Sequence, residues 1–66
     1  MNKAELRAGL EFLDALARDG RVLDATELRV QAAASGIPQA TLWQAVHRRG
    51  GVPGWSGALS WVEVAT

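Results

Sequence analysis

The fold is decided by residues 32–42, which read AAASGIPQATL. In a helix-turn-helix, a small residue in the first helix lets the second helix cross close to it. Four residues later a glycine takes the tight turn, and an aliphatic residue follows into the core. Ala32, Gly36 and Ile37 occupy these positions, and Leu42 comes five residues later, where the second helix must anchor inward. The spacing therefore predicts a helix-turn-helix in the middle of the chain.

Helix boundaries can be placed on either side of this motif. Two starts carry a capping residue with a glutamate three positions later, namely Asn2 with Glu5 and Asp24 with Glu27. A proline opens the third helical segment, and each segment ends close to a glycine, namely Gly20, Gly36 and Gly50. These signals predict three helices, at about residues 3–19, 25–35 and 38–49.

The apolar residues of each helix recur at three- and four-residue spacing, which predicts one inward stripe per helix. The predicted stripes are Leu6, Leu10, Leu13 and Ala17 with Leu16 beside them in the first helix, Ala25, Leu28, Ala32 and Ser35 in the second, and Leu42, Ala45 and Val46 in the third. Gly9 falls within the first stripe, so another helix is expected to approach closely there.

A hairpin is predicted after the third helix, over about residues 52–64. Two turn-forming pairs, Pro53-Gly54 and Ser56-Gly57, precede a segment at 59–64 that is rich in β-branched and aromatic residues. The link at 21–23 has the composition of a brief strand. The expected fold class is mainly α with a small β-hairpin, a three-helix winged helix-turn-helix. With 66 residues the chain has room for one core, so residues 1–66 form a single domain.

The segment from 22 to 64 resembles the winged-helix domain at the C-terminus of phage- and plasmid-type primase–helicase proteins. The residues that carry this resemblance are Gly36-Ile37, Thr41-Leu42, Ala45, Gly51-Val52 and Trp61. The family's last helix is dense in arginine and lysine, whereas this one has only His47, Arg48 and Arg49 as basic residues. The resemblance implies a winged helix that acts on DNA.

A DNA-binding site is predicted on the outer face of the third helix. Its residues are Gln39, Thr41, Trp43, Gln44, His47 and Arg48. The side-chain amide of Gln44 matches the hydrogen-bonding edge of adenine, and the guanidinium of Arg48 matches guanine or a phosphate. Gln39 and Thr41 lie near the start of the helix, where contacts with DNA phosphates are expected. Trp43 has three open roles: stacking on a base, anchoring a protein interface, or packing beneath the wing. The predicted function is transcription control, or replication or recombination in a phage or plasmid, by a homodimer.

The charge balance leaves a second function open. Seven basic side chains match seven acidic ones, and the expected wing turn carries no cation. A neutral chain favours a protein-interaction module, an adaptor or an inhibitor, as the alternative to DNA binding. Val30 and Trp55 are the candidate residues for a partner interface, since large apolar side chains at a surface favour contacts with proteins.

Several classes of protein are excluded by what the sequence lacks. It has no cysteine and one histidine, so neither a thiolate zinc site nor another metal cofactor is expected. No carboxylate pair, nucleophile with a base, or glycine-rich phosphate loop indicates an enzyme. No apolar run approaches the ~20 residues of a membrane span, and the N-terminus lacks the pattern of a secretory signal. The expected location is the cytoplasm.

Overall fold

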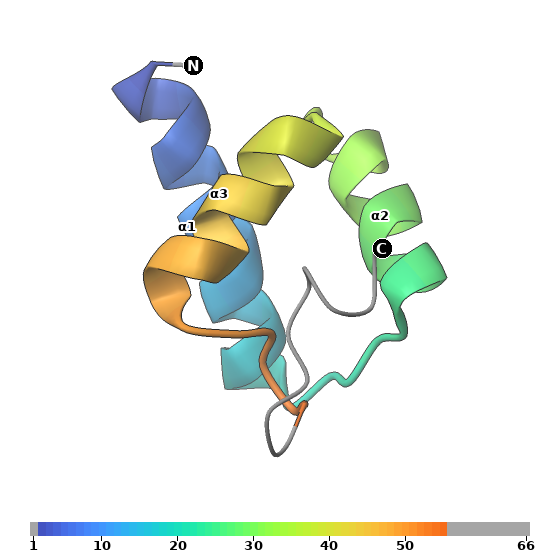
Figure 1. The fold of residues 1–66 in the computed structure, drawn as a ribbon. Coiled ribbons are helices and arrows are strands. Elements are labelled where there is room, and N and C mark those ends of the chain that lie inside the picture. The colour runs from blue at the N-terminus through green and yellow to red at the C-terminus, as the bar shows by residue number, and fades with distance from the viewer. Residues whose placement is uncertain (1, 56–66) are drawn as a thin grey trace.

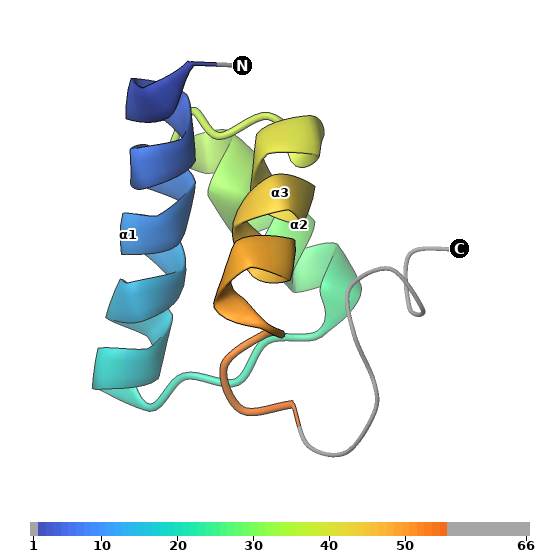
Figure 2. The ribbon, with the colours of Figure 1, turned by 60° about the vertical axis from the view of Figure 1, so that its left-hand side comes forward.

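The computed structural model describes residues 2–55, which form three helices (Figure 1). They are α1 (Lys3–Asp19), α2 (Ala25–Ala34) and α3 (Gln39–Arg49). All three predicted helices are confirmed, with boundaries within one residue of those expected. Figure 1 shows α3 in front of α1 with α2 to the right, and Figure 2 shows α1 standing to the left of both α3 and α2. The mainly α fold class is therefore confirmed.

Side-chain caps start the first two helices as predicted. Asn2 accepts a hydrogen bond at 2.8 Å from the backbone N–H of Glu5, and Asp24 accepts one at 2.8 Å from the N–H of Glu27. Each cap satisfies one of the backbone donors that a helix start leaves without an intrahelical partner. Pro38 stands at the N-cap of α3 and provides no such bond.

The turn between α2 and α3 is a Schellman motif centred on Gly36. The Ile37 N–H bonds the Ala32 carbonyl at 2.9 Å, and the Gly36 N–H bonds the Ala33 carbonyl at 3.0 Å. This pattern needs a left-handed residue, and Gly36 has φ = 78°. Ile37 then enters the core with 5% of its surface exposed. The turn predicted from Ala32, Gly36 and Ile37 is confirmed.

The core is one cluster to which all three helices and the following segment contribute. Its buried members are Leu13, Leu16, Leu28, Ala32, Ile37, Leu42, Ala45, Val46 and Val52. The predicted stripe of α3 is confirmed in full. Two predictions are wrong, because Ala17 and Ser35 are exposed. The inward face of α1 is centred on Gly9, Leu13 and Leu16, which places Ala17 beside the contact, and Ser35 lies past the last residue of α2.

The helices α1 and α3 approach each other closely at Gly9, as predicted. A Cβ atom at this position would lie 3.0 Å from the Cβ of Ala45 and 3.6 Å from the Cγ2 of Thr41. The missing side chain therefore lets α1 and α3 pack against each other almost backbone to backbone. Thr41 and Ala45 are one turn apart on α3, so both face α1.

After α3 the chain makes a tight turn over Val52–Trp55. The Trp55 N–H bonds the Val52 carbonyl at 3.1 Å, and Gly54, the third residue, has φ = 86°. Proline second and glycine third are the residues of a type II turn, so the predicted Pro53-Gly54 turn is confirmed. Residues 2–55 contain no strand. The second turn and the strand at 59–64 predicted for the wing lie outside the described residues.

The brief strand expected at 21–23 is wrong. Two of its backbone groups are engaged elsewhere: the Arg21 N–H bonds the Leu16 carbonyl at the end of α1, and the Leu23 carbonyl accepts from the Trp55 indole. The segment is an irregular link that joins α1 to α2 and contacts the turn after α3.

Candidate nucleic-acid interface

The outer face of α3 carries a stripe of exposed residues at helical spacing. Ala40, Gln44, His47 and Arg48 are all exposed, and successive members are three or four residues apart or adjacent at the end, so they share one face. The opposite face holds buried Leu42, Ala45 and Val46. We call this exposed stripe the outer stripe of α3. It carries no acidic side chain, because α3 contains none.

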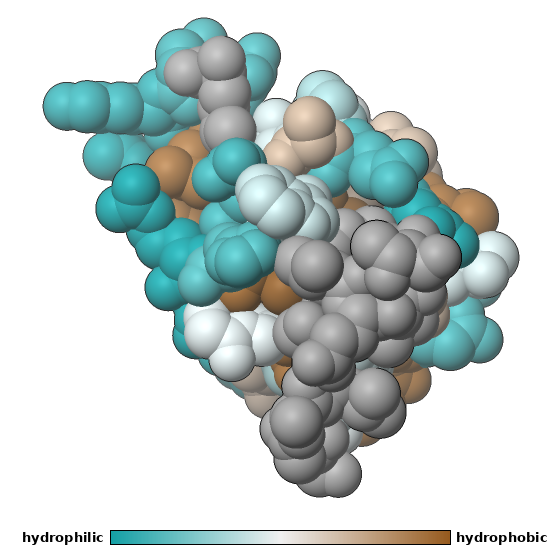
Figure 3. Space-filling model, viewed as in Figure 1, coloured by the Kyte–Doolittle hydropathy of each residue, from teal (hydrophilic) through white to brown (hydrophobic). Residues whose placement is uncertain are grey.

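Hydrophilic side chains dominate the surface around this stripe. Figure 3, viewed as in Figure 1, shows hydrophobic side chains only as small areas between hydrophilic ones on the part of that face that is coloured. A broad apolar interface for another protein would expose a contiguous hydrophobic patch. The coloured surface on this side of the molecule shows no such contiguous hydrophobic patch.

Arg48 and Arg49 are adjacent but differ in their surroundings. Arg49 reaches back to α1 and forms an ion pair and hydrogen bond with Asp14. Its side chain is only 30% exposed, so its stem covers part of the α1–α3 contact. Arg48 is exposed and forms no ion pair with any residue in the described range 2–55. Of the two, Arg48 is the cation available to an outside anion.

Trp43 and His47 contact each other along α3. Their ring centroids are 4.4 Å apart and the ring planes are tilted by 58°. Trp43 is half-buried and packs against the core, whereas His47 is exposed. The indole of Trp43 therefore packs against the core and against the imidazole of the outer stripe. The wing beneath which it was expected to pack lies outside the described residues.

One residue of the predicted site points the other way. Thr41 is 3% exposed and faces Gly9 of α1, so the predicted phosphate contact by its hydroxyl is wrong. The sequence spacing indicates this burial, because Thr41 lies one turn before the inward-facing Ala45. Gln39 is exposed at the start of α3, where the first turn has no acidic residue and no side-chain cap. No acidic side chain of α3 itself therefore offsets the positive end of the helix dipole there.

The two residues predicted to contact a protein partner differ in how far they are exposed. Val30 is 57% exposed on α2. Trp55 is half-buried, and its indole N–H donates to the Leu23 carbonyl at 2.8 Å. This bond docks the ring onto the link before α2, so Trp55 presents less apolar surface to a partner than Val30 does.

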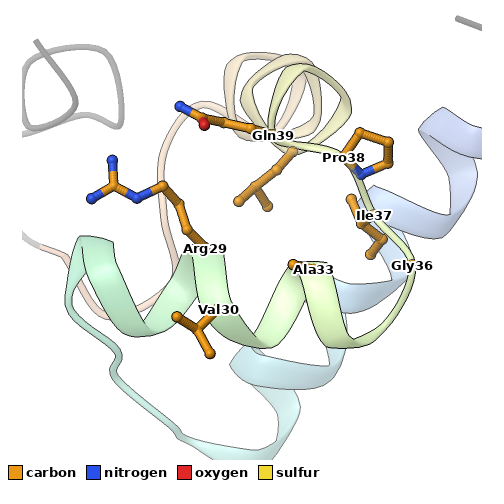
Figure 4. Close-up of a pocket in the computed structure, with 8 residues that line it drawn as sticks. Arg29, Val30, Ala33, Gly36, Ile37, Pro38 and Gln39 are labelled. Atoms are coloured by element: carbon orange, nitrogen blue, oxygen red, sulfur yellow. The ribbon is translucent and has the colours of Figure 1, made fainter.

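Sequence reasoning missed a groove between α2 and the start of α3 (Figure 4). It is lined by Arg29, Val30 and Ala33 from α2, by Ile37 and Pro38 from the turn, and by Gln39 and Leu42 from α3. We call it the α2–α3 groove. The apolar outer residues of α2 were visible in the sequence, but the groove also depends on the angle at which α3 leaves the turn.

Other kinds of site find no support in the part of the chain described. Residues 2–55 contain no group of three histidine, cysteine, aspartate or glutamate side chains that could hold a metal ion. None of the three helices is long and apolar enough to cross a membrane.

The comparisons with known proteins add no family. The chain matches no protein-family model, and comparisons with curated proteins and with solved structures also gave no match. What is established is a small globule of three helices. The wing and the relationship to primase–helicase domains rest on the sequence pattern alone.

Proposed function

We propose that this protein binds double-stranded DNA by placing α3 in the major groove. The observation that carries the proposal is the outer stripe of α3, which is exposed, free of acidic side chains and basic at its end. The turn that precedes α3 has the spacing of Ala32, Gly36 and Ile37 expected of a helix-turn-helix and is closed at a left-handed Gly36. The role would be transcription control, or replication or recombination in a phage or plasmid.

Each member of the outer stripe has a distinct contribution to such a complex. Ala40 is small, so the first turn of α3 can approach the floor of the groove. Gln44, one turn later, has the paired donor and acceptor that match adenine. Arg48, a further turn along, reaches guanine or a phosphate, and Gln39 contacts the backbone. Gln44 would therefore set sequence preference, while Arg48 would supply much of the affinity.

The low charge makes a homodimer part of the proposal. One copy presents few cations near α3, because Arg49 is paired with Asp14. Affinity for DNA rises with the number of phosphates neutralised. Two copies on neighbouring half-sites would double the available contacts, and half-sites one helical turn apart would suit a two-fold pair.

The first test is fluorescence anisotropy with a labelled random-sequence duplex at ~50 and ~200 mM salt. We expect micromolar binding that weakens at the higher salt, because released counterions drive the association. Arg48→Ala should weaken binding to every duplex and lower the slope of log affinity against log salt by about one per copy. Arg18→Ala is the matched control, since it removes an exposed arginine of α1 at about 180° from Gly9 around that helix.

Gln44→Ala separates sequence reading from general affinity. We expect it to flatten the preference found by site selection, with little change on random duplex. If the folded protein binds no DNA at either salt, the proposal is wrong and the protein-adaptor alternative replaces it. Equal affinity of the parent, Arg48→Ala and Gln44→Ala proteins would reject this docking of α3 even if DNA is bound.

A further inference from the structure

The contact between Trp43 and His47 holds in place a side chain of the outer stripe that is otherwise exposed. The two residues are one turn apart on α3, and their ring centroids are 4.4 Å apart. Trp43 is half-buried and packs against the core, whereas His47 is exposed. Within residues 2–55 the imidazole forms no hydrogen bond or ion pair. Its orientation therefore depends on the indole, and its ring nitrogens stay available to a ligand.

The position of His47 relative to Gln44 suits two neighbouring base pairs. His47 follows Gln44 by three residues, and both are exposed on the outer stripe. Side chains three residues apart on a recognition helix contact successive bases in the major groove. Three residues rise about 4.5 Å along a helix, which is close to the ~3.4 Å between base pairs. With Gln44 on adenine, His47 faces the neighbouring base pair.

The chemistry of an imidazole favours guanine at that neighbouring pair. A ring N–H of histidine donates a hydrogen bond, and guanine presents two acceptors, N7 and O6, in the major groove. Adenine places an amino donor beside its one acceptor, cytosine presents a donor, and thymine adds a methyl group to its acceptor. Guanine therefore matches a single N–H donor best.

We propose that α3 reads an adenine and a guanine in neighbouring base pairs, the guanine through His47, and that Trp43 is the positioning residue that holds the imidazole. This inference rests on the proposed docking of α3 in the major groove. Fixing an exposed side chain only on binding weakens an interaction by roughly two- to tenfold, and a side chain already held in place avoids this loss. Trp43 therefore raises affinity and selectivity through His47 rather than by touching DNA.

The test is site selection from a random-sequence duplex pool, followed by fluorescence anisotropy on the selected duplex. The parent protein should select an adenine next to a guanine. His47→Ala and Trp43→Leu should lose the preference for guanine and keep that for adenine, whereas Gln44→Ala should do the reverse. On the selected duplex we expect His47→Ala to weaken binding about fivefold or more, and Trp43→Leu two- to tenfold.

The double variant separates positioning from packing. If Trp43 acts through His47, then Trp43→Leu should have no further effect on DNA affinity once His47 is alanine. Trp43→Phe keeps an aromatic ring beside the imidazole and should retain most of the affinity. A loss of DNA affinity that is the same in both backgrounds would overturn the positioning role.

The ring contact itself can be measured without DNA. His47 is the one histidine of the chain, so its ring-proton NMR signals are assigned without ambiguity. The indole should displace them from the values of a free histidine, and Trp43→Leu should return them toward those values. Undisplaced signals in the parent protein would overturn the positioning role, and this measurement on the parent decides the matter even if Trp43→Leu does not fold.

The remaining outcomes separate this inference from the docking of α3. Equal weakening on every duplex by His47→Ala would assign the imidazole to a phosphate and overturn the reading of guanine. If Arg48→Ala and Gln44→Ala act as expected but His47→Ala changes nothing, this inference fails and the docking stands. If the folded parent protein binds no DNA, both are rejected.

Discussion

The two sides of α3 are built in opposite ways. On the α1 side, Gly9 has no side chain, and Thr41 and Ala45 approach it so closely that a Cβ atom would lie 3.0 Å from its neighbour. On the α2 side, the helices diverge from a glycine turn and leave an open groove with an exposed valine at its lip. The α1 side is closed by this tight packing against Gly9, whereas the α2 side is open to solvent.

This difference separates stability from recognition. A chain of this size has little stability to spare, so the α1–α3 contact is where packing must be efficient. The exposed outer stripe lies on a surface that the α1–α3 contact does not use. Substitutions on the α1 side should therefore act mainly on folding, and those in the outer stripe mainly on binding.

The largest effect is expected from Gly9→Val. The new side chain meets Ala45 and Thr41 at distances that α1 and α3 can relieve only by moving apart, so we expect a loss of about 1–3 kcal/mol in the free energy of unfolding. For a domain of this length each kcal/mol lowers Tm by roughly 4–8 °C. Thermal unfolding followed by circular dichroism measures the change.

Ala8→Val is the matched control, because Ala8 is the exposed neighbour of Gly9 on α1. It changes only the helix propensity, by at most about 0.7 kcal/mol. If the two valine variants unfold at the same temperature, the α1–α3 contact is looser than the distances at Gly9 indicate.

A smaller loss, about 1 kcal/mol, is expected on the α2 side from Gly36→Ala. No atom lies within 4 Å of the position that its Cβ would take, so the cost comes from the left-handed backbone at φ = 78° alone. Asparagine tolerates this conformation better than alanine. Denaturant unfolding should therefore rank the three proteins as Gly36, Gly36→Asn and Gly36→Ala, and an asparagine variant as unstable as the alanine one would contradict this account.

The helices could be predicted from the sequence because their signals are local. Asn2 and Asp24 cap their helices through a residue three positions away, and Gly36 closes a turn within six residues. A short window of sequence contains all the groups involved. The same holds for Pro53-Gly54, whose turn is closed by Trp55.

The errors fall where a distant element decides the outcome. Ala17 is exposed because α1 and α3 meet at Gly9, and neither helix alone determines the angle at which they meet. Trp55 docks against the carbonyl of Leu23, 32 residues earlier in the chain. The same distinction applies to the candidate site. Its exposed residues on α3 could be predicted from their spacing, but the α2–α3 groove could not, because it depends on how two helices are placed relative to each other.

The smallest effect is expected from Asp14→Asn, which tests the sealed side at its edge. Asp14 pairs with Arg49 across α1 and α3, but its side chain is 64% exposed, so water and salt screen the pair. We expect a loss of about 0.2–1 kcal/mol in the free energy of unfolding at ~50 mM salt, and almost no loss at ~1 M salt.

Asp19→Asn is the matched control. Asp19 is exposed at the C-terminal end of α1, where a negative charge opposes the helix dipole, so its removal should leave stability unchanged or slightly raised. Loss of the same size at both salt concentrations would show that Asp14 acts through packing rather than charge. The side chain of Arg49 would then be held by the buried part of its stem, and the α1–α3 contact would extend further along α3 than the close approach at Gly9.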